Sequence, residues 1–216
     1  GMIPGEFPPL KAEGGYATHL PLPHTRFFGR EEEIAALGKR LQAPEWRLVT
    51  LMGPGGSGKT RLALEVSRRL LDAWQGAVWF VSLADLTDPG PIAGAVRDAL
   101  RLPPAPTVGP LEQVVEMLAR QPALLVLDNV EHLVEEASLL VRALLDRTPT
   151  LTVLATSRQR LNLAGEHIFL VAPLPTPDGT QTPERLLQYE SVQLFLDRAQ
   201  AVRPDFQVTA RNAPAV

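Results

Sequence analysis

The sequence predicts a three-layer α/β fold in which helices cover both faces of a five-stranded parallel sheet. Apolar runs typical of buried strands alternate with segments of helical periodicity between residues 27 and 171. Parallel strands require crossover connections, and right-handed crossovers place helices on the faces of the sheet. The chain has 216 residues, 45% of them hydrophobic, which is enough for one such core and an accessory piece.

The first half of the chain is expected to supply two strands, at 47–52 and 77–83. Apolar residues at the spacing of one helix face predict a helix before the first strand, one after it and one after the second: Ile34, Leu37 and Leu41; Leu62, Val66 and Leu70; Ile92, Val96 and Leu100. A turn at 88–91 precedes the last of these helices, and a loop at 102–110 that is broken by prolines follows it.

The second half continues the alternation with a helix at 111–120 and a third strand at 123–127 that ends in Asp128. Leu133, Leu140 and Leu144 form the stripe of the next helix, which precedes a fourth strand at 151–155 and a fifth at 167–171. Because parallel strands bring their carboxyl ends to one edge of a sheet, a binding site is expected at that edge.

Composition excludes several classes of function. The formal net charge of −3 argues against broad electrostatic attraction to nucleic acid or to an anionic membrane. The absence of cysteine excludes disulfides, thiol catalysis and cysteine metal sites. The sequence has neither an apolar run of about 18 residues nor a signal-peptide pattern, so a cytoplasmic protein is expected. Residues 1–24, rich in Pro and Gly, are interpreted as a flexible lead-in, with Gly1 as a remnant of tag removal.

Residues 53–60, Gly-Pro-Gly-Gly-Ser-Gly-Lys-Thr, match the Walker A pattern between an expected strand and an expected helix, and we call them the phosphate loop. Glycines permit positive φ, so backbone N–H groups can turn toward a polyphosphate at the start of the helix. Lys59 would reach the β- and γ-phosphates, and the Thr60 hydroxyl would coordinate Mg²⁺. The alternative is a glycine-rich turn before a helix. The residues predicted here to bind nucleotide are Gly53, Pro54, Gly55, Gly56, Ser57, Gly58, Lys59, Thr60 and Arg61.

Asp128 ends the apolar strand Leu-Leu-Val-Leu-Asp, a pattern typical of a Walker B site. Such a carboxylate holds Mg²⁺, directly or through water, so Thr60 and Asp128 are the predicted metal ligands. A strand that ends in Asp also occurs in ordinary turns. The residue after it, Asn129, cannot serve as a general base, which predicts slow hydrolysis. Glu131 could act through a water, or its charge could simply favour the start of a helix, and both interpretations stay open. His132 is expected to have a surface or capping role.

Several motifs together resemble one family. They are Phe-Phe-Gly-Arg-Glu at 27–31, the phosphate loop, Leu-Val-Leu-Asp-Asn at 125–129 with Glu131 and His132, Ala-Thr-Ser-Arg at 155–158, and Gly-Glu-His at 165–167. The chain resembles the nucleotide-binding domain of bacterial STAND signal-transduction ATPases, which are similar to NB-ARC domains and often accompany LuxR-type or SARP-type DNA-binding domains. The likeness runs from about residue 21 to the last residue.

The resemblance implies a P-loop NTPase fold with strand order 5-1-4-3-2 and a site for ATP or ADP with Mg²⁺. It implies that Arg158, at the end of the fourth strand, contacts the γ-phosphate; an ordinary solvated arginine is the alternative. It implies that Phe28 contacts the base and that Arg30 lies near the ribose or phosphates. Alternatively, Phe28 anchors the lead-in and Arg30 pairs with a nearby acid. The catalytic residues expected on this basis are Lys59, Asp128, Arg158 and Glu131.

The resemblance also divides the chain into the lead-in, a nucleotide-binding domain at 25–172 and an incomplete helical lid subdomain at 173–216. The helix that carries Val192, Phe195, Leu196 and Ala199 would begin this lid. The implied function is a conformational switch for signalling or transcription control, with slow ATP hydrolysis in the full-length protein that is weak in this segment. The implied partners are adenine nucleotide, other domains of the parent protein and nucleotide-dependent homo-oligomers, without direct DNA or membrane binding by this segment. An AAA+-like remodelling ATPase, a small-molecule kinase and a scaffold without hydrolysis are the alternatives.

Overall fold

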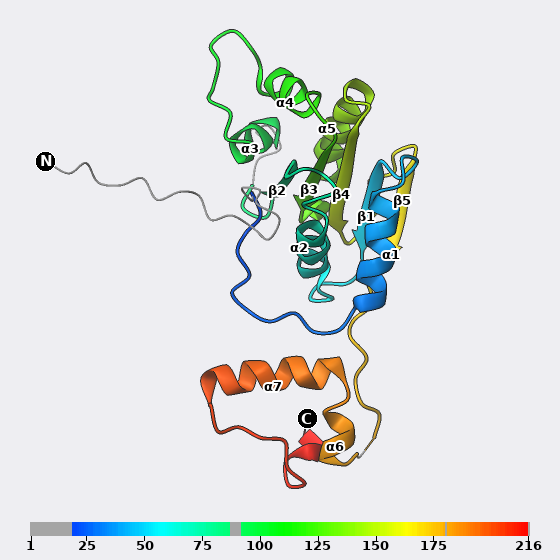
Figure 1. Ribbon diagram of the computed structural model, residues 1–216, viewed down its shortest axis with the longest axis vertical. Helices are drawn as coiled ribbons and strands as arrows, with labels where there is room; N and C mark the ends of the chain where they lie inside the picture. Colours follow the sequence, from blue (N-terminus) through cyan, green and yellow to red (C-terminus); the bar gives the residue numbers. More distant parts are fainter. Residues whose placement is uncertain (1–18, 87–91, 180, 216) are drawn as a thin grey trace, which may run out of the picture.

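A five-stranded parallel sheet forms the centre of the computed structural model, which describes residues 19–86, 92–179 and 181–215 (Figure 1). The strands are β1 (Leu48–Met52), β2 (Val78–Ser82), β3 (Ala123–Asp128), β4 (Leu151–Ser157) and β5 (Glu166–Leu170). Their spatial order is β2-β3-β4-β1-β5, which confirms the predicted order read from the opposite edge. The predicted turn at 88–91 and most of the lead-in lie outside the described residues.

Helices cover both faces of this sheet. They are α1 (Glu31–Leu41), α2 (Lys59–Arg69), α3 (Ile92–Ala99), α4 (Pro110–Leu118) and α5 (Val134–Arg147). On β3, Leu125 and Leu127 belong to the apolar cluster under α3, α4 and α5. Leu124 and Val126 point the other way, into the cluster under α1 and α2. This alternation along a strand buried on both sides explains why β3 is a continuous apolar run.

The helices begin and end where local chemistry favours it. Helix α1 starts with three consecutive glutamates and has basic residues in its last turn, which suits the helix dipole at both ends. Helix α4 starts at Pro110, a position where the missing N–H of proline is not needed. It ends at Leu118, two residues earlier than the sequence predicts. Glu131 lies in a short 3-10 turn, η1 (Val130–His132), which precedes α5.

The register of the strands brings their carboxyl ends together. Met52 of β1 pairs with Ser157 of β4, and Ser82 of β2 pairs with Asp128 of β3. Strand β4 therefore continues two residues beyond the predicted 151–155, because residues 156 and 157 still pair with β1. The phosphate loop and the residues that follow β3 and β4 consequently share one edge of the sheet, as expected for a parallel α/β fold.

The hydrogen bonds that Glu166 accepts explain why a carboxylate stands at the start of the edge strand β5. Glu166 accepts hydrogen bonds from Oγ1 of Thr50 at 2.7 Å and from the backbone N–H groups of Leu161 and Asn162, each at 2.9 Å. The bond to Thr50 joins β5 to β1, and the other two fix the loop between β4 and β5. We interpret the Gly-Glu-His motif at 165–167 as structural, with Gly165 in the left-handed region at φ 78°.

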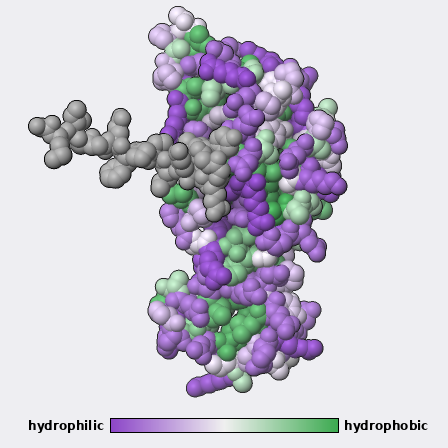
Figure 2. All heavy atoms as spheres, in the orientation of Figure 1, coloured by the Kyte–Doolittle hydropathy of each residue, from purple (hydrophilic) through white to green (hydrophobic). Residues whose placement is uncertain are grey.

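The described residues between 173 and 215 leave the sheet and form a separate group of helices, which we call the helical unit (Figure 1). It contains α6 (Pro183–Leu186), α7 (Glu190–Val202) and the 3-10 turn η2 (Ala213–Ala215). Its buried cluster is small and consists of Leu186, Val192 and Ala213. Phe195 of α7 is 46% exposed, so the predicted stripe on this helix is not buried as a whole. Apolar side chains reach the surface of the helical unit, at the lower end of Figure 2.

No helix among the described residues is both long and apolar enough to span a bilayer.

Candidate nucleotide-binding site

The phosphate loop turns sharply between β1 and α2. Gly56 and Gly58 have φ of 77° and 88°, in the left-handed region that glycine adopts readily. A side chain added to either glycine would meet no described atom within 4 Å, so both face open space. The Ser57 side chain is buried, and its Oγ has no hydrogen-bond partner among the described residues. Helix α2 starts directly at Lys59, so its first N–H groups end at this loop.

Lys59 is folded back over the phosphate loop. Its Nζ donates hydrogen bonds to the backbone carbonyls of Gly53 and Pro54, both at 3.0 Å. The residue is only 9% exposed, and lysine is rarely buried to this degree without a partner of opposite charge. Two neutral carbonyls therefore hold a full positive charge at the centre of the loop. An anion at this position would be attracted strongly, because the surroundings screen the charge poorly.

Asp128 accepts hydrogen bonds from two hydroxyl groups. Oγ1 of Thr60, at the start of α2, lies 2.7 Å from Oδ1 of Asp128. Oγ1 of Thr156, on β4, lies 2.6 Å from the same oxygen and accepts a bond from the backbone N–H of Asn129 at 2.9 Å. The structure thus brings together the two predicted metal ligands, Thr60 and Asp128. Thr156, which we did not predict as a site residue, fixes the orientation of the carboxylate.

Arg158 and Glu131 form an ion pair beside the phosphate loop. Nε of Arg158 lies 3.0 Å from Oε1 of Glu131. A Cβ added to Gly55 would lie 3.1 Å from Nη2 of Arg158, so the guanidinium packs against the loop itself. His132, next to Glu131, has a different partner: its Nε2 lies 3.0 Å from the carbonyl oxygen of Leu86.

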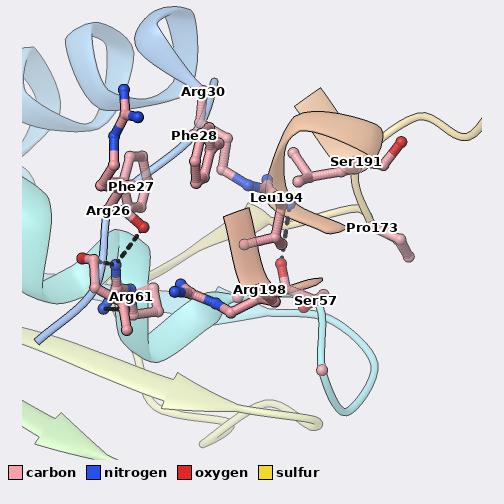
Figure 3. Close-up of a pocket in the computed structure, with 14 residues that line it drawn as sticks. Arg26, Phe27, Phe28, Arg30, Ser57, Arg61, Pro173, Ser191, Leu194 and Arg198 are labelled. Atoms are coloured by element: carbon pink, nitrogen blue, oxygen red, sulfur yellow. Dashed lines mark hydrogen bonds between the residues drawn. The ribbon is translucent and has the colours of Figure 1, made fainter. Parts of the chain in front are cut away.

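A cavity of about 400 Å³ opens beside the phosphate loop (Figure 3). It lies between the helical unit and the sheet with helices α1–α5, which we call the sheet unit. Three groups of residues line it: Thr25, Arg26, Phe27, Phe28 and Arg30 before and at the start of α1; Gly56, Ser57, Gly58 and Arg61 of the phosphate loop and α2; and Pro173, Leu174, Ser191, Leu194 and Arg198 of the helical unit. Its volume is in the range of small-molecule sites. Ser191, Leu194 and Arg198 lie on one face of α7, at spacings of three and four residues.

Two arginines of this cavity are bound to backbone carbonyls. Nη2 of Arg30 donates to the carbonyls of Ser57 at 2.9 Å and Ala172 at 2.6 Å, and Nη1 pairs with Glu33 at 3.2 Å. Arg30 therefore joins the phosphate loop to the point where the chain leaves the sheet. Arg61 donates to the carbonyls of Thr25 and Arg26 at 2.8 and 2.9 Å (Figure 3). Both guanidinium groups shape the cavity by fixing its walls.

The structure brings the predicted site residues together at one edge of the sheet. The phosphate loop, Asp128, Glu131 and Arg158 form one cluster, and Phe28, Arg30 and Arg61 line the adjoining cavity. Sequence reasoning missed Thr25, Leu194 and Arg198, which also line this cavity. Arg198 extends from α7 toward Arg61 (Figure 3). No motif marks these residues, although the spacing of Ser191, Leu194 and Arg198 on one helix face is a signal visible in the sequence.

Gly53 offers a test of how tightly the phosphate loop packs. An added Cβ would lie 2.3 Å from the carbonyl oxygen of Val171 and 2.9 Å from Oγ of Ser57. Because the first contact is with backbone, Gly53→Ala should lower the free energy of unfolding by about 1–3 kcal/mol. Gly94→Ala in α3 is the matched control, since its Cβ would meet no described atom within 4 Å, and it should raise stability by about 0.5–1 kcal/mol. Urea unfolding followed by tryptophan fluorescence measures both, and equal effects would contradict the expected clash.

Comparisons with known proteins match most of the chain. The family described as AAA ATPase domain matches residues 26–156. An uncharacterized protein of Mycobacterium tuberculosis is 35% identical over 192 residues, which cover 89% of this chain and 46% of that protein. A second protein of this organism, provisionally named an HTH-type transcriptional regulator, is 38% identical over 170 residues, which cover 79% of this chain and 18% of that protein. The chain thus spans about half the length of the first relative and a smaller part of the second.

Two solved structures are also similar. One is a signal transduction ATPase with numerous domains (STAND) and a tetratricopeptide repeat sensor from Pyrococcus horikoshii, with 17% identity, a TM-score of 0.44, and coverage of 91% of this chain and 28% of that one. The other is Cdc6p from Pyrobaculum aerophilum, with 19% identity, a TM-score of 0.49, and coverage of 84% and 50%. Because the AAA ATPase domain match includes the phosphate loop and Asp128 and covers more than half of the 216 residues, the chain belongs to the AAA ATPase domain family.

Proposed function

We propose that this segment binds Mg-ATP and Mg-ADP at the phosphate loop and hydrolyses ATP slowly, as the conformational switch of a larger STAND-type regulator. One observation carries the proposal. Lys59 and its neighbour Thr60 lie together with Asp128, which is far from them in the sequence, at one loop beside a cavity of suitable size. Each of these side chains has a separate task in phosphate and metal binding, and a glycine-rich turn without such a function would need none of them.

The phosphate loop fits a polyphosphate chain. The Lys59 ammonium is held by carbonyls at the centre of the loop, where it can exchange these neutral partners for phosphate oxygens. Two glycines with positive φ leave the space next to the backbone open, and the buried Oγ of Ser57 has no described partner. The start of α2 adds N–H groups and the positive end of the helix dipole. These features all favour an anion at the same place.

Thr60 and Asp128 fit a Mg²⁺ ion that is shared with the nucleotide. Magnesium prefers oxygen ligands and is commonly held by one or two protein groups together with substrate phosphates and water. The described residues contain no cluster of three or more His, Cys, Asp or Glu that could hold a metal. A hydroxyl and a carboxylate 2.7 Å apart supply two oxygen ligands. When bound, the metal would neutralise charge on the phosphates.

The cavity beside the phosphate loop fits the base and ribose of the nucleotide. Phe27, Phe28 and Leu194 give it apolar walls, and Thr25 and Ser191 add hydroxyl groups. Arg30 and Arg61 act here by fixing the backbone of these walls. No guanine-reading Asn-Lys-x-Asp pattern occurs in the sequence, and we propose adenine as the preferred base.

The helical unit gives the proposed switch its moving part. Helix α7 contributes one wall of the cavity, while the phosphate loop belongs to the sheet unit. A nucleotide that contacts both walls can stabilise one arrangement of the two units, provided that ATP and ADP contact them differently. We therefore propose residues 25–172 as the nucleotide-binding domain and residues 173–216 as part of a helical lid. A role in transcription control is supported by the relative provisionally named an HTH-type regulator, and DNA binding would belong to other parts of the parent protein.

Calorimetric titration of the 216-residue chain with Mg-ADP, Mg-ATP and Mg-GDP tests this proposal. We expect saturable binding of both adenine nucleotides, weaker binding of GDP, and ADP as the nucleotide released when freshly purified protein is denatured. Single-turnover hydrolysis should be slow, because Asn129 cannot act as a base. Size measurements with ADP and with a non-hydrolysable ATP analogue distinguish a conditional switch, which would change its oligomeric state with the nucleotide, from an obligate ring former of the AAA+-like remodelling class. No heat with either adenine nucleotide would contradict the proposed function.

A further inference from the structure

Glu131 and Arg158 stand out in the site because they neutralise each other at the place where hydrolysis would occur. We propose that Arg158 restrains Glu131 as a latch, and that a terminal phosphate releases Glu131 by drawing Arg158 away, so that Glu131 becomes the general base only when a triphosphate is bound. The inference rests on the proposed function, since it concerns hydrolysis at the same phosphate loop. It assigns a joint function to Glu131 and Arg158, which belong to different sequence motifs.

The position of the Arg158 guanidinium supports the latch. Its Nε lies 3.0 Å from Oε1 of Glu131, and its Nη2 would lie 3.1 Å from a Cβ on Gly55. The planar group therefore bridges η1 and the phosphate loop. An arginine fork binds carboxylate and phosphate oxygens by the same geometry, so a phosphate at the loop competes directly with Glu131 for this cation. The Arg158 side chain is 64% exposed, and little packing opposes a change of partner.

Glu131 is only partly satisfied in this pair. Its side chain is 17% exposed, and its Oε2 is buried without a hydrogen-bond partner among the described residues. A buried carboxylate oxygen without a partner is costly, and such groups in folded proteins call for an explanation. The backbone around it is fixed, because Nε2 of Gln159 donates to the carbonyl of Glu131 at 3.1 Å. The carboxylate thus has one oxygen without a described partner, and its other oxygen, Oε1, becomes free for a water molecule only when Arg158 leaves.

The adjoining residues cannot take over the role of base. Asn129 is an amide with a φ of 64°, and its backbone N–H is bound to Thr156. Asp128 already accepts two hydroxyl hydrogen bonds at one oxygen and is the proposed metal ligand. In the proposed step, the oxygen of water forms a bond to the γ-phosphorus and the bond to the bridging oxygen breaks. ADP leaves with that electron pair, and the carboxylate of Glu131 accepts the proton of the water.

The latch has a consequence that a purely structural ion pair would not have. Binding a triphosphate requires Arg158 to leave Glu131, whereas binding a diphosphate does not. The intact pair therefore weakens ATP binding and leaves ADP binding unchanged. Removing the charge of Glu131 should accordingly strengthen the binding of a triphosphate, although the same change abolishes the base.

A double-mutant cycle in the 216-residue chain tests the latch, with affinities for ADP and for a non-hydrolysable ATP analogue measured by calorimetry. Glu131→Gln should raise the affinity for the analogue about three-fold, as expected for the loss of an ion pair whose arginine is exposed, and leave the affinity for ADP unchanged. Arg158→Ala should lower the affinity for the analogue about ten-fold and again spare ADP. In the Arg158→Ala background, Glu131→Gln should have no effect. Single-turnover hydrolysis by Glu131→Gln should fall about 100-fold.

Arg160→Ala and Glu135→Gln are the matched controls, because both residues are exposed and lie in the same two segments of the chain. Neither should change the affinity for either nucleotide. The latch would be overturned if Glu131→Gln left the affinity for the ATP analogue unchanged or lowered it. It would also be overturned if the rise in this affinity persisted in the Arg158→Ala background, or if the affinity for ADP rose as well. A parent chain that binds no nucleotide would instead overturn the proposed function, and this inference with it.

Discussion

Replacing Lys59 with alanine should lower the affinity for Mg-ADP by about 100-fold, or about 3 kcal/mol. Lys59 is 9% exposed, and among the described residues its ammonium is held only by the carbonyls of Gly53 and Pro54. It is therefore oriented toward a phosphate chain before binding, and little reorganisation opposes the new contact. Truncating a buried charge also leaves its charged partner, here the β-phosphate, without compensation. Calorimetric titration of the variant with Mg-ADP measures the loss.

Lys39→Ala provides the control for this variant. Lys39 is exposed in the last turn of α1, so its removal changes the net charge by the same amount without touching the site. Its affinity for Mg-ADP should equal that of the parent chain. Thermal unfolding should show that Lys59→Ala keeps the fold, since the two carbonyls that it leaves belong to a loop open to water. Unchanged ADP binding by a folded Lys59→Ala protein would refute binding at the phosphate loop.

Substituting asparagine for Asp128 should reduce single-turnover hydrolysis by about 100-fold, or about 2.7 kcal/mol of the activation barrier. An asparagine oxygen can still accept the bonds from Thr60 and Thr156, so the local geometry should survive. What disappears is the negative charge that would hold Mg²⁺ opposite the phosphate loop. The affinity for ATP should lose most of its dependence on Mg²⁺, while the affinity for ADP without the metal should stay close to that of the parent chain.

Asp146→Asn is the matched control for the loss of charge. Asp146 lies on α5, its side chain is 71% exposed, and it pairs only loosely with Arg142 at 3.9 Å. This variant should retain full hydrolysis and full dependence on Mg²⁺. If hydrolysis by Asp128→Asn matched that of the parent chain, Asp128 would have a structural role and the predicted metal site would be wrong.

The sequence alone predicted the architecture of the sheet and the candidate site residues at its edge. Apolar runs of strand length, helical stripes and the glycine spacing of residues 53–60 are properties of neighbours along the chain, so each can be recognised without the folded state. All five strands lie where these patterns predict them, apart from small shifts of their ends. The strand order, which the family resemblance implied, also holds.

Tertiary structure decided which of these residues act on one another. Arg158 pairs with Glu131, and Arg30 binds carbonyls of Ser57 and Ala172, contacts between residues that the sequence places far apart. Phe195 fits a helical stripe but is exposed, because the helical unit has few buried residues to pack against it. Local patterns determine whether a segment forms a helix or a strand. Which residues contact one another depends instead on which strand ends lie side by side in the sheet and on how large a hydrophobic core each unit contains.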